Sequence, residues 1–257
     1  MQQLEIELTS KVYLTTNEIC CYVDASFGVT YSISGMTNLL HELGYVYKKP
    51  KLVAANPDYD AQEIFIQQYI DFMATKKENE AVFFVDAVHP VHNSTAACGW
   101  IKKGASVALK SNTGRNRLNI HGAMNAETFE TTIVAGEAPV NAESTIQLLQ
   151  CLEKVYPLAA VIYLILDNAG YHFSREVQAY LAQTNKFRFI FLPAYSPELN
   201  LIERLWRVLR KNVLYNKFYA TYGEFKRACM GFFENQLHHY DEIVSIMGDG
   251  LHALAAT

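Results

Sequence analysis

Apolar residues in the C-terminal third of the chain recur at the spacing of one helix face. In residues 192–206, LPAYSPELNLIERLW, Ser196 is a residue type favoured at helix N-caps and Pro197 suits the first helical position. The apolar stripe that follows comprises Leu199, Ile202, Trp206, Leu209 and Val213. The pattern predicts a helix that begins at Ser196 and buries this stripe, with Glu203 at the border between the stripe and the polar face.

Between residues 60 and 193 the pattern changes repeatedly between short apolar runs and helical periodicity. The runs predict strands at 81–87, near 105–110, and at 117–124, 131–135, 160–167 and 187–193. The periodic segments predict helices at 60–75, 142–155 and 174–184. Several strands in succession, followed by alternating helices and strands, indicate an α/β domain with helices packed on a mixed sheet.

Two short helices are predicted near the N-terminus, in TTNEICCYV (15–23) and YSISGMTNLLHELGY (31–45). Ser32 or Ser34 can cap the second helix, and Gly44 can end it. The connection SFGVTYS is short and contains a glycine, so the pair is typical of a helix-turn-helix, and YVYKKPK after it resembles the strand of a wing. Any small three-helix domain can share this pattern.

The composition limits the size of the core and the cellular location that we expect for the chain. Its 257 residues are 50% apolar, which is enough for one large core or two modest ones. The longest apolar run, residues 155–166, contains Pro157 and is too short to span a membrane. The start, MQQLEIELTS, is acidic and lacks an apolar signal core, so we expect a cytoplasmic protein with no membrane partner. The five cysteines form no C-x-x-C pair, and reduced, buried thiols are expected.

Basic residues are concentrated in two segments, although the net charge is −4. Residues 98–120 contain five basic residues and no acid, and residues 186–227 contain nine basic residues against three acids. A basic stripe can follow the phosphates of a nucleic acid, although a solvated surface explains the same pattern. The candidate DNA-binding residues are Asn38, Lys102, Lys103, Arg115, Arg117, Arg204, Arg207 and Lys211.

Three acids stand at the ends of predicted core elements. Asp86 interrupts the apolar strand in FFVDAVHP, Asp167 ends the most apolar strand in LILDNAGYH, and Glu203 borders the helix described above. Any one of them can simply cap a turn, and Asp167 before Asn168 fits an Asx-turn. Together they favour a site, because the carboxyl ends of neighbouring strands are where α/β proteins bind ligands. Carboxylates without a Cys or His partner suit Mg²⁺ or Mn²⁺, and two such ions can activate a hydroxyl nucleophile at a phosphodiester.

The order of these residues resembles DDE transposases, in particular the bacterial insertion-sequence relatives of the mariner transposases. The resemblance rests on LDNAGYH and YSPELNLIE, on GW followed by KKG (99–104), and on RLNIHGAM (117–124), and it covers residues 12–240. It implies a ribonuclease-H-like mixed sheet flanked by helices and preceded by a small helix-turn-helix, winged-helix-like domain.

The implied domains are a helix-turn-helix DNA-binding domain (1–50), a linker and helix (51–78), a ribonuclease-H-like DDE catalytic domain (79–240) and a C-terminal tail (241–257). These enzymes carry another helix-turn-helix upstream, so residues 1–50 are expected to be the second of two, with the first missing.

The resemblance implies a DNA transposase with Asp86, Asp167 and Glu203 as its metal-binding catalytic triad and Mg²⁺ or Mn²⁺, as two ions, for cofactor. Metal-activated water would cut a phosphodiester at the transposon end, and the freed 3′-hydroxyl would attack target DNA. The implied partners are double-stranded DNA, both terminal inverted repeats and target, and a second copy of the chain in a homodimer associated with the bacterial nucleoid. A non-catalytic DNA-binding descendant and a ribonuclease-H-like structure-specific nuclease are the alternatives.

Other polar and aromatic residues near these motifs have less defined roles. Asn168 and His172 are expected to orient Asp167 or the substrate. Trp100 is expected in the core, and the roles of His89 and His92 stay open.

Overall fold

The chain forms two compact units, Met1–Val53 and Ala54–Thr257. The structure is a computed structural model and describes residues 2–50, 58–113 and 115–248. The first part of the predicted linker, residues 51–57, lies outside the described residues. Among the helices of the described ranges, none has the length and apolarity needed to cross a membrane.

The smaller unit is a bundle of three helices, α1 (Gln2–Ser10), α2 (Thr16–Phe27) and α3 (Ile33–Glu42). Its core comprises Leu4, Ile19, Cys20, Val23 and Met36. The two predicted helices are confirmed as α2 and α3, and Ser32 caps α3 by accepting a hydrogen bond from the amide of Gly35 at 3.1 Å. Helix α1 was not predicted, because MQQLEIELTS carries too few apolar residues to show a helical period.

Gly44, two residues after the last residue of α3, terminates this helix as predicted. Gly44 has a φ of 81°, and its amide donates to the carbonyl of His41 while the amide of Tyr45 donates to that of Leu40. This pair of bonds is a Schellman motif, which requires a left-handed residue that glycine adopts without strain. The predicted wing strand is wrong for its described part: residues 45–50 form no strand, and Tyr47 is almost fully exposed. The described part of this unit contains no strand with which the backbone of residues 45–50 could pair.

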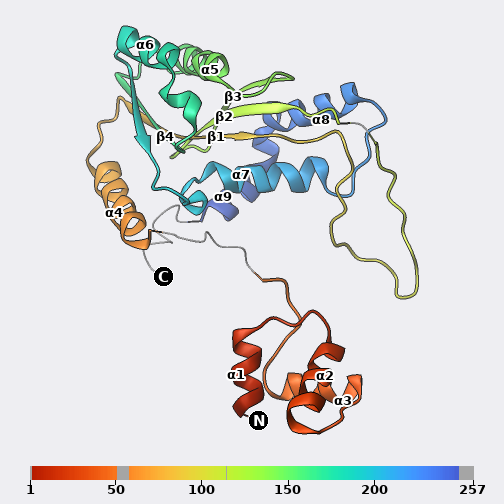
Figure 1. The fold of residues 1–257 in the computed structure, drawn as a ribbon. Helices are drawn as coiled ribbons and strands as arrows, with labels where there is room; N and C mark the ends of the chain where they lie inside the picture. Colours follow the sequence, from red (N-terminus) through yellow and green to blue (C-terminus); the bar gives the residue numbers. More distant parts are fainter. Residues whose placement is uncertain (1, 51–57, 114, 249–257) are drawn as a thin grey trace. The chain divides into compact units, whose positions relative to one another are not determined.

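The larger unit is built on a five-stranded mixed sheet with the order β3-β2-β1-β4-β5 (Figure 1). The strands are β1 (Glu80–Val88), β2 (Asn119–Asn125), β3 (Thr131–Gly136), β4 (Val161–Leu166) and β5 (Phe187–Phe191). Strands β1, β4 and β5 run parallel, and β2 and β3 are antiparallel to their neighbours. This arrangement agrees with the mixed sheet predicted from the order of strands and helices.

Helices cover both faces of this sheet (Figure 1). One face packs on α5 (Ala142–Val155) and α6 (Arg175–Thr184), around Phe83, Val85, Leu148, Leu149 and Leu164. The other face packs on α4 (Tyr59–Thr75), α7 (Ile202–Leu209), α8 (Tyr222–Glu234) and α9 (Tyr240–Met247). Because side chains alternate along a strand, Phe84 and Val88 of β1 lie on the α7 face, and Asp86 between them shares that face.

The helix predicted to begin at Ser196 begins later. Residues Pro197–Leu199 form a short 3-10 turn, α7 starts at Ile202, and Arg210–Leu214 form a π-helical turn after it. Ser196 makes no cap hydrogen bond; its buried hydroxyl accepts from the amide of Gln62 in α4 at 3.0 Å. The predicted apolar stripe is confirmed, since all five of its side chains are buried.

The segment predicted as a C-terminal tail also differs. Residues 240–247 form α9, and Ile243 and Met247 are fully buried in the core of the larger unit. Residues 249–257 lie outside the described part of the chain.

Between β1 and β2 the chain makes a long excursion, visible as the yellow-green loop in Figure 1. We call its exposed part, residues 98–111, the β1–β2 arm. The strand predicted near 105–110 is wrong, because no strand lies beside this apolar run within the described residues. Trp100, predicted in the core, is fully exposed, and Cys98 is also exposed. The expectation of buried thiols holds for Cys20 and Cys229 but not for Cys21 or Cys98.

The ends of the arm are held against the segment after α7. The side-chain amide of Asn216 accepts from the amide of Ala97 at 2.9 Å and donates to its carbonyl at 3.0 Å. Buried His92 lies 2.9 Å from the carbonyl of Tyr219, to which Asn112 also donates. His92 therefore has a structural position at the base of the arm. His89 is exposed and pairs with Asn119.

Candidate active site

Two of the three predicted acids come from neighbouring parallel strands. Phe84 of β1 pairs with Ile165 of β4, and two residues further along each strand stand Asp86 and Asp167. Neighbouring strands are about 5 Å apart, and side chains two residues apart share a face, so both carboxylates extend from the α7 side of the sheet. The register of β1 and β4 therefore brings the two acids together.

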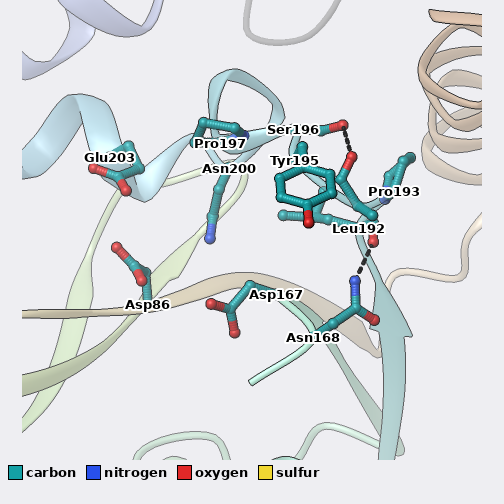
Figure 2. Close-up of a pocket in the computed structure, with 11 residues that line it drawn as sticks. Asp86, Asp167, Asn168, Leu192, Pro193, Tyr195, Ser196, Pro197, Asn200 and Glu203 are labelled. Atoms are coloured by element: carbon teal, nitrogen blue, oxygen red, sulfur yellow. Dashed lines mark hydrogen bonds between the residues drawn. The ribbon is translucent and has the colours of Figure 1, made fainter. Parts of the chain in front are cut away.

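The third acid, Glu203, lies in the first turn of α7, which packs on this face. Figure 2 shows Asp86, Asp167 and Glu203 pointing toward one space. All three line a cavity of about 440 Å³, which is also lined by residues 192–197 after β5 and by Asn168 and Asn200. The predicted convergence of the acids is thus present in the structure.

The carboxyl of Asp86 is strongly desolvated. Burial, then the neighbouring charge of Glu203 and to a smaller extent that of Asp167, together raise the pKa of its carboxyl to about 7. The amide of Ala87 and the indole N–H of Trp206 partly offset this effect, and the indole donates to Oδ2 at 2.8 Å. Asp86 therefore carries a proton over much of the neutral range unless a cation replaces it.

The pKa of Asp167 is shifted in the opposite direction. Its side chain is 56% exposed, and Nε2 of buried His172 lies 3.6 Å from Oδ1. The pKa of Asp167 is held below its ordinary value by His172, then by the amide of Ala169, which donates to Oδ1 at 3.1 Å, against the effect of burial. The Asx-turn is real, and the same carboxylate also faces the cavity.

The donor set fits hard divalent cations. Neither Asp86 nor Glu203 has a lysine or arginine partner in the described ranges. In those ranges no three His, Cys, Asp or Glu side chains are grouped as ligands of a single ion. Carboxylate oxygens are the ligands that such cations prefer.

Buried polar atoms without a hydrogen-bond partner gather around the acids. Among the described residues they include both ring nitrogens of His121, Nδ1 of His172 and Oδ1 of Asn200. Burial and the neighbouring His172 lower the pKa of His121 to about 3, so its ring is neutral. Sequence reasoning missed His121 and Asn200, because a histidine within an apolar strand and an asparagine before a helix look structural.

The two predicted supporting residues occupy different positions. His172 contacts Asp167, as described above. Asn168 donates from its side chain to the carbonyl of Leu192 at 2.9 Å, which ties the end of β4 to the end of β5 (Figure 2). It shapes the cavity wall, and no hydrogen bond between the side chains of Asn168 and Asp167 is present.

The predicted DNA-binding residues divide into free and engaged groups. Arg204 donates to the carbonyl of Met247 at 2.6 Å, and Lys211 pairs with Glu242 of α9 at 2.6 Å, so both help to hold α9. The remaining six are exposed: Asn38 on α3, Lys102 and Lys103 in the arm, Arg115 and Arg117 after it, and Arg207 on α7.

Family models match both parts of the chain. A model described as DDE superfamily endonuclease matches residues 81–226, more than half of the chain, and one described as winged helix-turn helix matches residues 10–69. The chain is 28% identical over 218 residues to the insertion element IS630 uncharacterized 39 kDa protein of Shigella sonnei, covering 84% of this chain and 60% of that protein. Over 83 residues it is 31% identical to the uncharacterized protein y4pE/y4sA of Sinorhizobium fredii. The chain thus spans about 60% of the length of the curated relatives it matches.

Solved structures of the Mos1 transposase have a similar fold. The Mos1 transposase paired-end complex with left transposon end matches with a TM-score of 0.67 and 16% identity, over 99% of this chain and 77% of that chain. The Mos1 mariner paired-end complex with Mn matches with a TM-score of 0.67 and 17% identity, over 98% and 75% of the two chains. The predicted ribonuclease-H-like fold with an N-terminal helix-turn-helix region is confirmed by these matches.

Proposed function

The chain belongs to the DDE superfamily of endonucleases, and from that membership and the geometry of its acids we propose that it is a DNA transposase. The convergence of Asp86, Asp167 and Glu203 on one cavity carries the proposal. The proposed reaction is metal-dependent hydrolysis of a phosphodiester at a transposon end, followed by transfer of the freed 3′-hydroxyl into target DNA.

We propose that Asp86, Asp167 and Glu203 hold two Mg²⁺ or Mn²⁺ ions. Bound ions of this kind activate a hydroxyl nucleophile and stabilise the leaving oxygen of a phosphodiester. The charges of both Glu203 and Asp167 act on the carboxyl of Asp86. Asp86 is therefore the ligand best placed to bind both ions. His172 keeps Asp167 ionised, so this carboxylate is ready to bind a cation without first losing a proton.

The proposed substrate is double-stranded DNA, as terminal inverted repeats and as target. Lys102, Lys103, Arg115, Arg117 and Arg207 are the exposed cations available for phosphates, and Asn38 on α3 is available for a base edge. Arg204 and Lys211 are weaker candidates, because binding phosphate would cost them their contacts with α9.

We also propose that the chain acts as a homodimer in the bacterial cytoplasm, in association with the nucleoid. The β1–β2 arm exposes Trp100, Ile101, Val107 and Leu109, an unusual amount of apolar side chain for one segment. A second copy that covers these side chains would remove them from water. Light scattering of the wild type and of a Trp100→Ser variant tests this step: a smaller mass for the variant supports it, and equal dimeric masses place the interface elsewhere.

The function is tested by incubating the chain with DNA that carries the ends of its own element. Cleavage and joining should require Mg²⁺ or Mn²⁺, and Asp86→Asn, Asp167→Asn and Glu203→Gln should each abolish them while the circular dichroism spectrum is kept. Activity that persists in EDTA, or in all three variants, would contradict the mechanism.

Pre-cut DNA distinguishes the alternatives. Ends supplied with free 3′-hydroxyls should be joined to a plasmid by a transposase, whereas a structure-specific nuclease would cut without joining. A non-catalytic DNA-binding protein would do neither, although it would still retard the DNA in a gel.

A further inference from the structure

Two hydrogen bonds, one buried and one partly buried, connect the region around Glu203 to strand β1. The side-chain amide of Asn200 donates to the carbonyl of Val85 at 2.9 Å, and the indole N–H of Trp206 donates to Oδ2 of Asp86 at 2.8 Å. Asn200 is 4% exposed and Trp206 is fully buried. We call these two bonds the α7–β1 hydrogen-bond pair.

The pair is placed symmetrically about the third acid. Asn200 stands three residues before Glu203 and Trp206 three residues after it, and their acceptors, Val85 and Asp86, are consecutive in β1. The amide of Glu203 donates to the carbonyl of Asn200 at 3.0 Å, so Asn200 is attached to the first turn of α7. The start of α7 is therefore fixed against β1 on both sides of Glu203.

Strand β2 is adapted to the indole. Gly122 pairs with Asp86 across β1 and β2, and a Cβ at Gly122 would lie 2.7 Å from Cη2 of Trp206 and 3.4 Å from Cδ1 of Ile202. Real Cβ atoms do not approach other atoms to 2.7 Å, and the buried indole has little room to move. Glycine at this position allows Trp206 to reach the carboxylate of Asp86.

We propose that Asn200 and Trp206 are positioning residues that set the separation and orientation of Asp86 and Glu203 for cation binding. The inference rests on the proposed function, because it takes these acids as metal ligands. Residues that hydrogen-bond a metal ligand fix its orientation, and losing them typically weakens metal affinity about 10–100-fold. Here one helix supplies both a ligand, Glu203, and the donor that orients the opposing ligand.

The test is Mn²⁺ binding by the full chain, measured by isothermal titration calorimetry. Trp206→Phe keeps an aromatic ring in the core but removes the donor, and Asn200→Ala removes the amide. Each should weaken Mn²⁺ binding about 10-fold or more. The matched control is Asn119→Ala, which removes another buried amide that donates to backbone carbonyls, those of Glu137 and Ala138. This control should lower the melting temperature yet keep wild-type Mn²⁺ affinity.

A second variant changes the geometry and keeps every donor. Gly122→Ala should displace the indole from Asp86 and weaken Mn²⁺ binding as Trp206→Phe does. In the Trp206→Phe background the same Gly122→Ala change should have a smaller effect on affinity, because phenylalanine lacks the ring atom Cη2 that meets the new methyl group. Additive effects of the two changes would contradict the role given to Gly122.

The outcomes separate this inference from the proposed function. If the wild type binds no Mn²⁺, or Asp86→Asn binds it equally well, the proposed metal site is wrong. If the wild type binds Mn²⁺, Asp86→Asn does not, and Trp206→Phe and Asn200→Ala match Asn119→Ala in affinity, then the site stands and the hydrogen-bond pair only stabilises the core. Weaker binding in both variants, with the control unchanged, supports the positioning role.

Discussion

The single residue with the most unusual environment is Asp86. It is an acid in the middle of a sheet, on a face that otherwise carries Phe84 and Val88. Removal from water disfavours its charged form, and the nearby Glu203 adds repulsion. Such a carboxyl lowers the stability of the folded chain whenever it is ionised and unpaired, so its place in the core has a cost that a bound cation would offset.

This cost predicts a dependence of stability on pH. The pKa of Asp86 rises from 3.8 to about 7 on folding, so between these values the folded chain keeps a proton that the unfolded chain loses. The contribution of Asp86 to the free energy of unfolding is therefore most favourable below about pH 4. It declines as the pH rises toward 7, by at most about 4 kcal/mol. In metal-free urea unfolding, Asp86→Asn should gain stability relative to the wild type over this window. If the free energies of unfolding of the two proteins depended on pH in the same way, the raised pKa of Asp86 would be contradicted.

The sequence alone identified the acids of this site because each one interrupts an apolar pattern. Asp86 and Asp167 are conspicuous within and after apolar strands, and Glu203 borders an apolar stripe. The residues that support them could not be predicted, because apolar patterning explains them fully: Trp206 belongs to the buried stripe, and Gly122 reads as a small residue in a strand. Their roles depend on contacts between elements distant in the chain.

At the scale of elements, prediction succeeded where a segment packs on the sheet. The strands β1 to β5 and the helices α5 and α6 lie where the apolar runs and periodic segments indicated. It failed at residues 105–110, where an apolar run has no partner strand in the described structure, and at Ser196, whose hydroxyl binds Gln62 instead of capping a helix. The pattern of apolar residues within one segment does not show which surface of the protein that segment will pack against.

The β1–β2 arm gives a prediction at this scale. Asn216, with a φ of 56°, holds Ala97 at the start of the arm through two side-chain hydrogen bonds. Asn216→Gly keeps that backbone conformation without strain but removes both bonds, so trypsin should cut faster at lysines of the arm. Mass spectrometry of timed digests measures this change. The control is Asn185→Gly, another asparagine with a positive φ (54°), at the end of α6, and it should leave arm cleavage unchanged.

At the scale of the whole molecule, the two units have separate cores. Among the described residues, the core of the smaller unit contains five buried hydrophobic residues, while the proposed metal site lies entirely in the larger unit. Calorimetry should therefore show two unfolding transitions, with the smaller unit melting first because little apolar surface is buried in it. Mn²⁺ at about 100 times its Kd should stabilise only the larger unit, by about 2.7 kcal/mol. One transition, or equal shifts of both, would show that the units unfold together.

The positions of the two tryptophans make the chain its own optical probe. Trp100 is fully exposed in the arm, whereas Trp206 is fully buried with its indole N–H on Asp86. A Trp100→Phe variant would leave one tryptophan, in direct contact with a carboxylate proposed to bind metal. Its emission should change when Mg²⁺ is added and stay constant in the Trp100→Phe, Asp86→Asn double variant. Occupancy of the proposed metal site could then be followed in solution by light, without DNA and without a label.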